Sequence, residues 1–309
     1  MSFTTKVKDE ITRLEFSKSE NIAELSAFLR SNAKIEKDKI EIITENAKVA
    51  KRIYLLIYNI YQIKCAIDEK KKTIFNKSTI YVITISEKIN NILVDLSIVD
   101  ENSNYLEQPK DYIIDSEEEK KAYLRGTFLA HGSINDPKTS SYHLEFLYDE
   151  KMESVFVQRM LNQFDLNSKI IIREFKYMIY IKDSEKISDF LKLINAYQAV
   201  LYYENIKIVK EQKNATNRLN NCEQANIDKM IHTCNMQIED IKKIEQYMGL
   251  EMLDEKIQEA CKYRLKYPES SLTELSEIIS LETNKKITKS GLNHRFRKIR
   301  EIASKIKEN

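Results

Sequence analysis

The sequence predicts an α+β fold with an internal duplication, followed by a separate all-α domain. Two consecutive stretches show the same order of elements, helix-strand-helix-strand-strand-helix, about a hundred residues apart. Residues 196–247 contain neither glycine nor proline, which favours continuous helix. The C-terminal part has three short helical stretches, and the last of them is strongly basic.

The first copy of the repeat is predicted to occupy residues 1–98. Apolar side chains recur at helical spacing in four segments, so we expect helices at 4–15, 21–31, 48–61 and 86–96. Three segments are rich in β-branched and aromatic residues, so we expect strands at 39–44, 63–68 and 79–85. A polar segment that contains Pro109, residues 99–116, is predicted to be a linker.

The second copy is predicted to occupy residues 117–195. Its first helix, 116–131, begins with a capping box made by Ser116 and Glu119. Further helices are predicted at 151–164 and 184–194, and strands at 142–148, 169–175 and 177–182. A helical connector at 196–249 follows, either as one helix or as two with a break near Asn220 and Asn221, and Gly249 is expected to end it.

Residues 250–309 are predicted to form a small helical domain. Its helices are expected at 254–267, 272–280 and 290–307, with Pro268 ending the first and a capping box at Ser271 and Glu274 starting the second. The second and third helices each carry one apolar stripe, which would form a shared core. This is a helix-turn-helix arrangement, although its turn, residues 281–286, is longer than the minimal 3–4 residues.

The overall composition indicates a folded intracellular protein. Hydrophobic residues make up 42% and charged residues 32% of the chain, and no apolar run is long enough for a membrane span or a signal core. We therefore expect a cytoplasmic, nucleoid-associated protein. The four cysteines are widely separated, so neither a disulfide framework nor a zinc site is expected, and no cofactor is predicted.

Residues 123–134 hold the most informative motif of the repeated part. Gly126 lies inside a predicted helix, where glycine costs about 1 kcal/mol relative to alanine, so we expect it to allow close approach of a second helix. Gly132 is expected to end that helix and turn the chain into a strand. The motif resembles the signature helix of LAGLIDADG homing endonucleases, with a fainter first copy at residues 25–33. The resemblance implies a duplicated αββαββα-type domain whose two signature helices pack on a pseudo-dyad.

The signature departs from the nuclease pattern at its catalytic positions. The nuclease places a metal-binding carboxylate just before the last residue of each signature, because two-metal hydrolysis needs hard oxygen ligands. The matching residues here are Asn32 and His131. We therefore predict no metal site, no catalytic residue and no enzymatic activity, with His131 as a structural histidine at a helix end.

Several further blocks resemble the WhiA family. They are the N-terminal Ser2-Phe3-Thr4-x-x-Val7-Lys8-x-Glu10, the stretch that follows the second signature at residues 134–137, and the run Asn217-Arg218 to Ala225-Asn226. The resemblance implies a transcription regulator connected with cell division and chromosome segregation, and with sporulation in some relatives. The role of the Asn217–Asn226 run is not evident from its residues, and Cys222 within it is expected to be a buried small residue rather than a nucleophile.

The basic C-terminal helix is the predicted DNA-binding element. From Thr283 to Asn309 there are nine lysines and arginines against two glutamates, a local charge of +7, whereas the whole chain carries only +2. Leu292, Phe296 and Ile299 form its apolar stripe. The expected DNA-binding residues are Thr288, Lys289, Ser290, Asn293, His294, Arg295, Arg297, Lys298 and Arg300.

These residues are expected to divide into two groups. Lys289, Asn293 and Arg297 lie four apart on one face and are expected to reach base edges, whereas Arg295, Lys298 and Arg300 should mostly meet phosphates. The segment Ser290 to Arg295 also resembles a WhiA signature. A basic protein-interaction domain is the alternative reading.

The sequence therefore predicts double-stranded DNA as the main partner. RNA polymerase or a sigma factor is a further partner to consider. Two alternatives stay open: an active LAGLIDADG-type endonuclease, and a scaffold on which the endonuclease-like domain binds the transcription or division machinery. The operator, the direction of regulation and the oligomeric state do not follow from the sequence.

Overall fold

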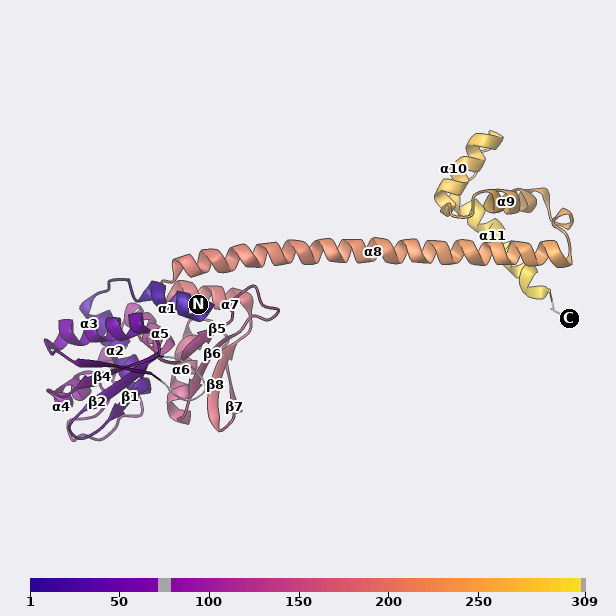
Figure 1. Ribbon diagram of the computed structural model, residues 1–309. Coiled ribbons are helices and arrows are strands. Elements are labelled where there is room, and N and C mark those ends of the chain that lie inside the picture. Colours follow the sequence, from indigo (N-terminus) through magenta and orange to yellow (C-terminus); the bar gives the residue numbers. More distant parts are fainter. Residues whose placement is uncertain (72–78, 307–309) are drawn as a thin grey trace. The chain divides into compact units, whose positions relative to one another are not determined.

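A computed structural model of the protein describes residues 1–71 and 79–306 (Figure 1). The chain divides into two compact units, Met1–Lys210 and Glu211–Asn309. The first is an α+β unit with two four-stranded antiparallel sheets, and the second is helical, so the predicted fold class is confirmed. Among the described residues, no helix combines the length and the apolar character that crossing a membrane requires.

The first copy of the repeat builds one sheet with strand order β1-β2-β4-β3. Its elements are α1 (Phe3–Ile11), α2 (Lys18–Asn32), β1 (Ala33–Ile35), β2 (Ile40–Thr44), α3 (Ala47–Tyr61), β3 (Ala66–Lys71), β4 (Thr79–Ile85) and α4 (Ile89–Asp95). Strand β1 was not predicted, because it has only three residues and is defined by its pairing with β2, with Ala33 opposite Ile42. The segment predicted to be a linker contains η1 (Asp111–Ile113), and Ile113 is buried in the core of the unit.

The second copy repeats this topology with strand order β5-β6-β8-β7. Its elements are α5 (Glu117–His131), β5 (Gly132–Ile134), β6 (Leu144–Tyr148), α6 (Lys151–Gln163), β7 (Lys169–Arg173), β8 (Lys176–Ile181) and α7 (Ser184–Leu193). As expected, Gly132 is the C-cap at which α5 gives way to a strand, and the capping box at Ser116 is present. Identical strand orders in the two sheets establish the internal duplication.

The signature helices α2 and α5 pack side by side at the centre of the unit (Figure 1). Gly126 of α5 lies directly against the backbone of α2, since a Cβ atom built on it would lie 2.2 Å from the Glu24 carbonyl oxygen and 3.0 Å from the Ala27 Cβ. The close approach predicted for this glycine is therefore present.

Helix α8 (Tyr197–Tyr247) is one continuous helix, which decides between the two alternatives left open by the sequence. In the first unit, its N-terminus is held by the Glu10 carboxylate, which accepts the backbone N–H groups of Gln198 (2.6 Å) and Ala199 (3.0 Å). Residues 211–229 are all exposed. The expectation that Cys222 is buried is therefore wrong, because its side chain lies in this exposed stretch of the helix.

The second unit is a small helical bundle. The end of α8 packs with η2 (Leu250–Met252), α9 (Glu255–Lys266), α10 (Leu272–Thr283) and α11 (Lys289–Lys305). Ile241 and Ile244 of α8 share one core with the apolar stripes of the other helices. The capping box at Ser271 is present, but the last helix ends at Lys305 rather than at residue 307, because Ile306 is already extended.

Candidate nucleic-acid interface and the degenerate catalytic positions

Helix α11 presents a polar face to solvent because its apolar stripe is fully used by the core. Leu292, Phe296 and Ile299 are 0%, 4% and 1% exposed. Four other residues on the helix, which include all three expected base readers, are exposed: Lys289, Asn293, Arg297 and Lys298. The helix phase therefore follows the spacing of the apolar residues, and Gly291 does not disturb it.

The N-terminus of α11 is capped by Thr288, whose hydroxyl accepts the Gly291 N–H at 3.1 Å. Ser290 and His294 are also exposed on the first turns of the helix, and Arg300 is exposed further along it. Of the nine residues expected to meet DNA, Arg295 alone is partly buried. Within the described part of the chain, no ion pair engages Lys289, Arg297 or Lys298, so their charges face solvent.

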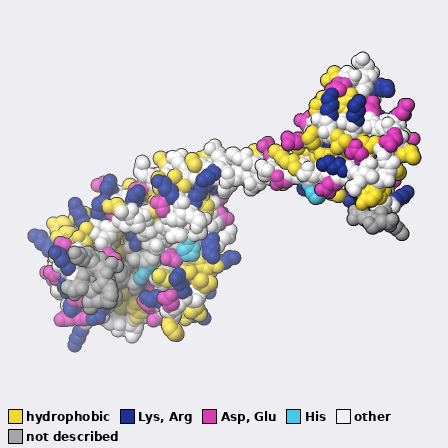
Figure 2. All heavy atoms as spheres, turned by 45° about the vertical axis from the view of Figure 1, so that its right-hand side comes forward, with side chains coloured by type: hydrophobic (Ala, Val, Ile, Leu, Met, Phe, Trp, Pro, Cys, Tyr) yellow, Lys and Arg dark blue, Asp and Glu magenta, His cyan; other side chains and the backbone are white. Residues whose placement is uncertain are grey.

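Arg295 serves the packing of the bundle. Its guanidinium donates to the Glu259 carboxylate at 2.8 Å and to the Lys256 carbonyl at 3.0 Å, both on α9, and its side chain is 17% exposed. A phosphate contact by Arg295 would compete with this ion pair. Figure 2 shows basic and acidic side chains intermixed on the C-terminal unit. The candidate interface is therefore identified by the exposed basic residues of α11 rather than by a large basic patch.

The two degenerate catalytic positions lie at the ends of the signature helices. Asn32 ends α2, and its side-chain amide donates to the Ile43 carbonyl at 2.9 Å. His131 ends α5, with its Nε2 atom 2.8 Å from the Ser31 carbonyl oxygen and its ring 5.2 Å from that of Tyr148. Burial lowers the pKa of His131. Asn32 thus binds the backbone of β2, and His131 contacts the backbone of α2 and the ring of Tyr148.

A lysine from the N-terminal block that resembles the WhiA family lies beside these positions, in a role that the sequence did not predict. Lys8 of α1 donates to the Leu129 carbonyl of α5 at 3.0 Å, and burial lowers its pKa to about 8. Lys8 and Asn32 line the same cavity, of about 740 Å³. The carboxylates of Asp9 and Glu45 line this cavity as well, and Asp9 is paired with Lys48. Among the described residues, no group of three or more histidine, cysteine, aspartate or glutamate side chains is placed to hold a metal.

The centre of the helix pair contains a buried ion cluster that the sequence analysis also missed. The Glu24 carboxylate of α2, which is 0% exposed, accepts from Arg125 Nε of α5 at 2.6 Å and from Arg52 Nη2 of α3 at 2.9 Å. Burial raises the pKa of Glu24, but hydrogen bonds and charges from the two arginines outweigh it and hold the pKa below its ordinary value. The cluster joins α2, α3 and α5, and its carboxylate, that of Glu24, does not face solvent.

The fold and the site together define a class: a duplicated LAGLIDADG-like unit without the catalytic carboxylates, followed by a helix-turn-helix unit. Family models agree along the chain. They are the WhiA N-terminal LAGLIDADG-like domain at residues 18–99, the WhiA LAGLIDADG-like domain at 120–213 and the WhiA C-terminal HTH domain at 216–303.

Individual relatives agree over the full length. A probable cell division protein WhiA from Bacillus cytotoxicus is 42% identical, over 99% of this chain and 98% of its own. Its counterpart from Brevibacillus brevis is 41% identical, over 100% and 98%. The chain belongs to the WhiA family.

Two solved structures share the fold. The crystal structure of full-length WhiA from Thermatoga maritima has a TM-score of 0.60 and 24% identity, and the match covers 100% of both chains. The N-terminal LAGLIDADG domain of WhiA has a TM-score of 0.50 and 21% identity, and covers 62% of this chain and 90% of that one.

Proposed function

We propose that the protein is a non-catalytic, sequence-specific DNA-binding transcription regulator that acts in cell division and chromosome segregation. The DNA-binding part of the proposal rests on the exposed face of α11, where Lys289, Asn293 and Arg297 lie in one row and neither cation has an ion-pair partner among the described residues. The WhiA HTH model and the names of the relatives support the proposal, since those relatives are described as probable cell division proteins.

In the proposed complex, the N-terminal half of α11 lies in the major groove. Asn293 and Arg297 make bidentate contacts to base edges, which is the chemistry by which amide and guanidinium groups distinguish bases. Lys298 and Arg300 neutralise phosphates, and the N-terminus of the helix, at Thr288 and Ser290, meets a further phosphate. Arg295 keeps α11 against α9 through its ion pair with Glu259.

The test uses the full-length protein and DNA sites selected from a random duplex library. Asn293→Ala or Arg297→Ala should weaken binding to the selected site by about 1–3 kcal/mol and reduce the preference for one base at the contacted position. Lys298→Ala should weaken binding to all duplexes about equally. It should also lower the slope of log binding constant against log salt concentration by about one unit.

Lys262→Ala is the matched control, because it removes one exposed lysine from α9 and should change neither quantity. Absence of duplex binding would refute the proposal. If Asn293→Ala kept discrimination while Lys298→Ala abolished it, the assignment of the two faces would be wrong.

The alternative of an active endonuclease has less support. Neither Asn32 nor His131 is a carboxylate, and the Lys8 ammonium lies in the cavity that Asn32 lines. Incubation of selected DNA with Mg²⁺ or Mn²⁺ should leave both strands intact, whereas cutting that disappears with His131→Ala would reinstate the nuclease. A scaffold role for the first unit, with RNA polymerase or a sigma factor as partner, is compatible with DNA binding and rests on family resemblance alone.

A further inference from the structure

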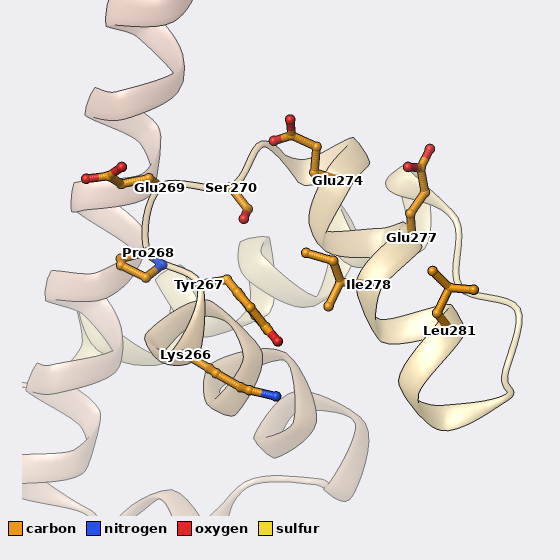
Figure 3. Close-up of a pocket in the computed structure, with 9 residues that line it drawn as sticks. All are labelled: Lys266, Tyr267, Pro268, Glu269, Ser270, Glu274, Glu277, Ile278 and Leu281. Atoms are coloured by element: carbon orange, nitrogen blue, oxygen red, sulfur yellow. The ribbon is translucent and has the colours of Figure 1, made fainter.

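A groove of about 620 Å³ lies on the helix-turn-helix unit, between the end of α9 and one side of α10 (Figure 3). One wall is the turn after α9, with Tyr267 and Pro268. The other wall is α10, with Ile278 and Leu281. All of these residues belong to the second unit, so the groove is a feature of that unit alone.

The apolar side chains of α10 that line the groove are not part of the core of the unit. Leu275 and Ile279 fill the core from α10 and are both 0% exposed. Ile278 and Leu281, three residues apart, form a second apolar row on the groove side, and Leu281 is 79% exposed. An exposed second apolar row, beside the one that fills the core, is the pattern that docks another apolar surface.

The rim of the groove is acidic. Glu269, Glu274 and Glu277 all line it, and Figure 3 shows the two glutamates of α10 at its edge. Glu274 is engaged in the capping box with Ser271, whereas neither Glu269 nor Glu277 forms an ion pair within the described residues. These two carboxylates are therefore available to a cationic partner.

The one lysine of the lining does not balance this charge. The Lys266 ammonium lies 3.1 Å from both carboxylate oxygens of Glu282, so its charge is already matched. The groove consequently keeps a net negative potential, which repels the DNA backbone and attracts lysine and arginine side chains. Its occupant is therefore expected to be a protein rather than a nucleic acid.

We propose that this groove docks a basic amphipathic helix of a partner protein. Apolar side chains on one face of that helix would cover Ile278 and Leu281, and flanking lysines or arginines would pair with Glu269 and Glu277. A helix suits the site because apolar anchors at i, i+3 and i+7 match the row along α10. None of the residues that line the groove is among the expected base readers of α11, so the proposal is tested independently of DNA binding.

The first experiment measures binding of a labelled synthetic peptide to the full-length protein by fluorescence anisotropy. The peptide has leucines on one helical face and lysines elsewhere. Its comparator has the same composition with the leucines scattered around the helix. We expect saturable, salt-sensitive binding of the amphipathic peptide only, weakened by about tenfold or more in Glu277→Lys and in Leu281→Ser. Equal binding of both peptides, or no binding, would overturn the proposal.

Matched control variants keep the result specific to the groove. Glu301→Lys and Met252→Ser make the same kinds of change at exposed positions outside the groove lining, and they should leave peptide binding unchanged. All four variants change exposed side chains, and thermal unfolding followed by circular dichroism checks that each is folded. If the controls weakened binding as much as Glu277→Lys and Leu281→Ser, the effect would be general charge or hydrophobicity, and the proposal would fail.

A second experiment identifies the occupant in cells. A photo-crosslinking amino acid at position 281 should capture a partner segment that maps, by mass spectrometry of the crosslinked peptide, to a basic amphipathic helix. The crosslink should disappear with Glu277→Lys. A crosslink to DNA, to another copy of this chain or to an acidic segment would overturn the proposal, and so would no crosslink at all.

Discussion

Replacing Gly126 by alanine sets two effects of opposite sign against each other. Alanine is about 1 kcal/mol more favourable than glycine inside a helix, so propensity alone predicts a more stable protein. The added Cβ atom, however, would lie 2.2 Å from the Glu24 carbonyl oxygen. Ordinary C···O contacts begin near about 3.3 Å, so α2 and α5 would have to separate by roughly 1 Å.

We expect the cost of separating α2 and α5 to exceed the gain in helix propensity. Forcing extra atoms into a packed core costs about 1–3 kcal/mol even when flexible side chains can move aside, and here the opposing atom belongs to the backbone. The signature helices lie at the centre of the core, so their separation also loosens neighbouring contacts. After the gain in propensity of about 1 kcal/mol is subtracted from a cost at the upper end of this range, we expect Gly126→Ala to lower the free energy of unfolding by about 2 kcal/mol.

Gly291→Ala in α11 is the matched comparison. A Cβ atom there would meet only the Thr288 hydroxyl, at an ordinary contact distance of 3.4 Å, so this substitution should be neutral or stabilise by up to about 1 kcal/mol. Denaturant unfolding read by hydrogen exchange on peptides of each unit separates the two stabilities. If Gly126→Ala unfolded at the wild-type denaturant concentration or above it, the close-packing argument would be refuted.

Two further predictions concern buried charges. Glu24→Gln leaves two arginines without their buried counterion and should cost about 3–5 kcal/mol in the same assay; a loss below about 1 kcal/mol would mean that the cluster is not desolvated. Burial lowers the pKa of Lys8 from 10.5 to about 8, so the unfolded chain binds this proton more tightly than the folded one. Stability should therefore gain a contribution from this group as pH rises from about 8 toward 10.5, and Lys8→Met should remove it; identical pH profiles for the two proteins would contradict this.

Local patterns were enough to predict most elements. The strand predicted at residues 79–85 coincides with β4, because its β-branched and aromatic residues need only neighbouring strands to define it. The capping boxes at Ser116 and Ser271 are present because their geometry is set within four residues. The phase of α11 was predictable for the same reason, since Leu292 and Phe296 determine it by their spacing.

Contacts between distant segments were not predictable. Lys8 belongs to an N-terminal block that resembles the WhiA family, but its hydrogen bond goes to a carbonyl 121 residues away, and nothing in the block indicates that partner. The same holds for Arg125, whose partner Glu24 lies 101 residues away. Cys222 was misplaced for a different reason: composition indicates that a small residue is often buried, but burial of a helix depends on what packs against it.

The loss of the catalytic carboxylates does not undo the helix pair, because its cohesion comes from other atoms. The contact of Gly126 with the α2 backbone and the His131 hydrogen bond to Ser31 join the two helices without a metal. Lys8 adds a positive charge against the last carbonyls of α5, where the helix dipole is negative and a cation is stabilising. The contacts that hold the ends of the two signature helices therefore involve α1 as well as the two signature positions.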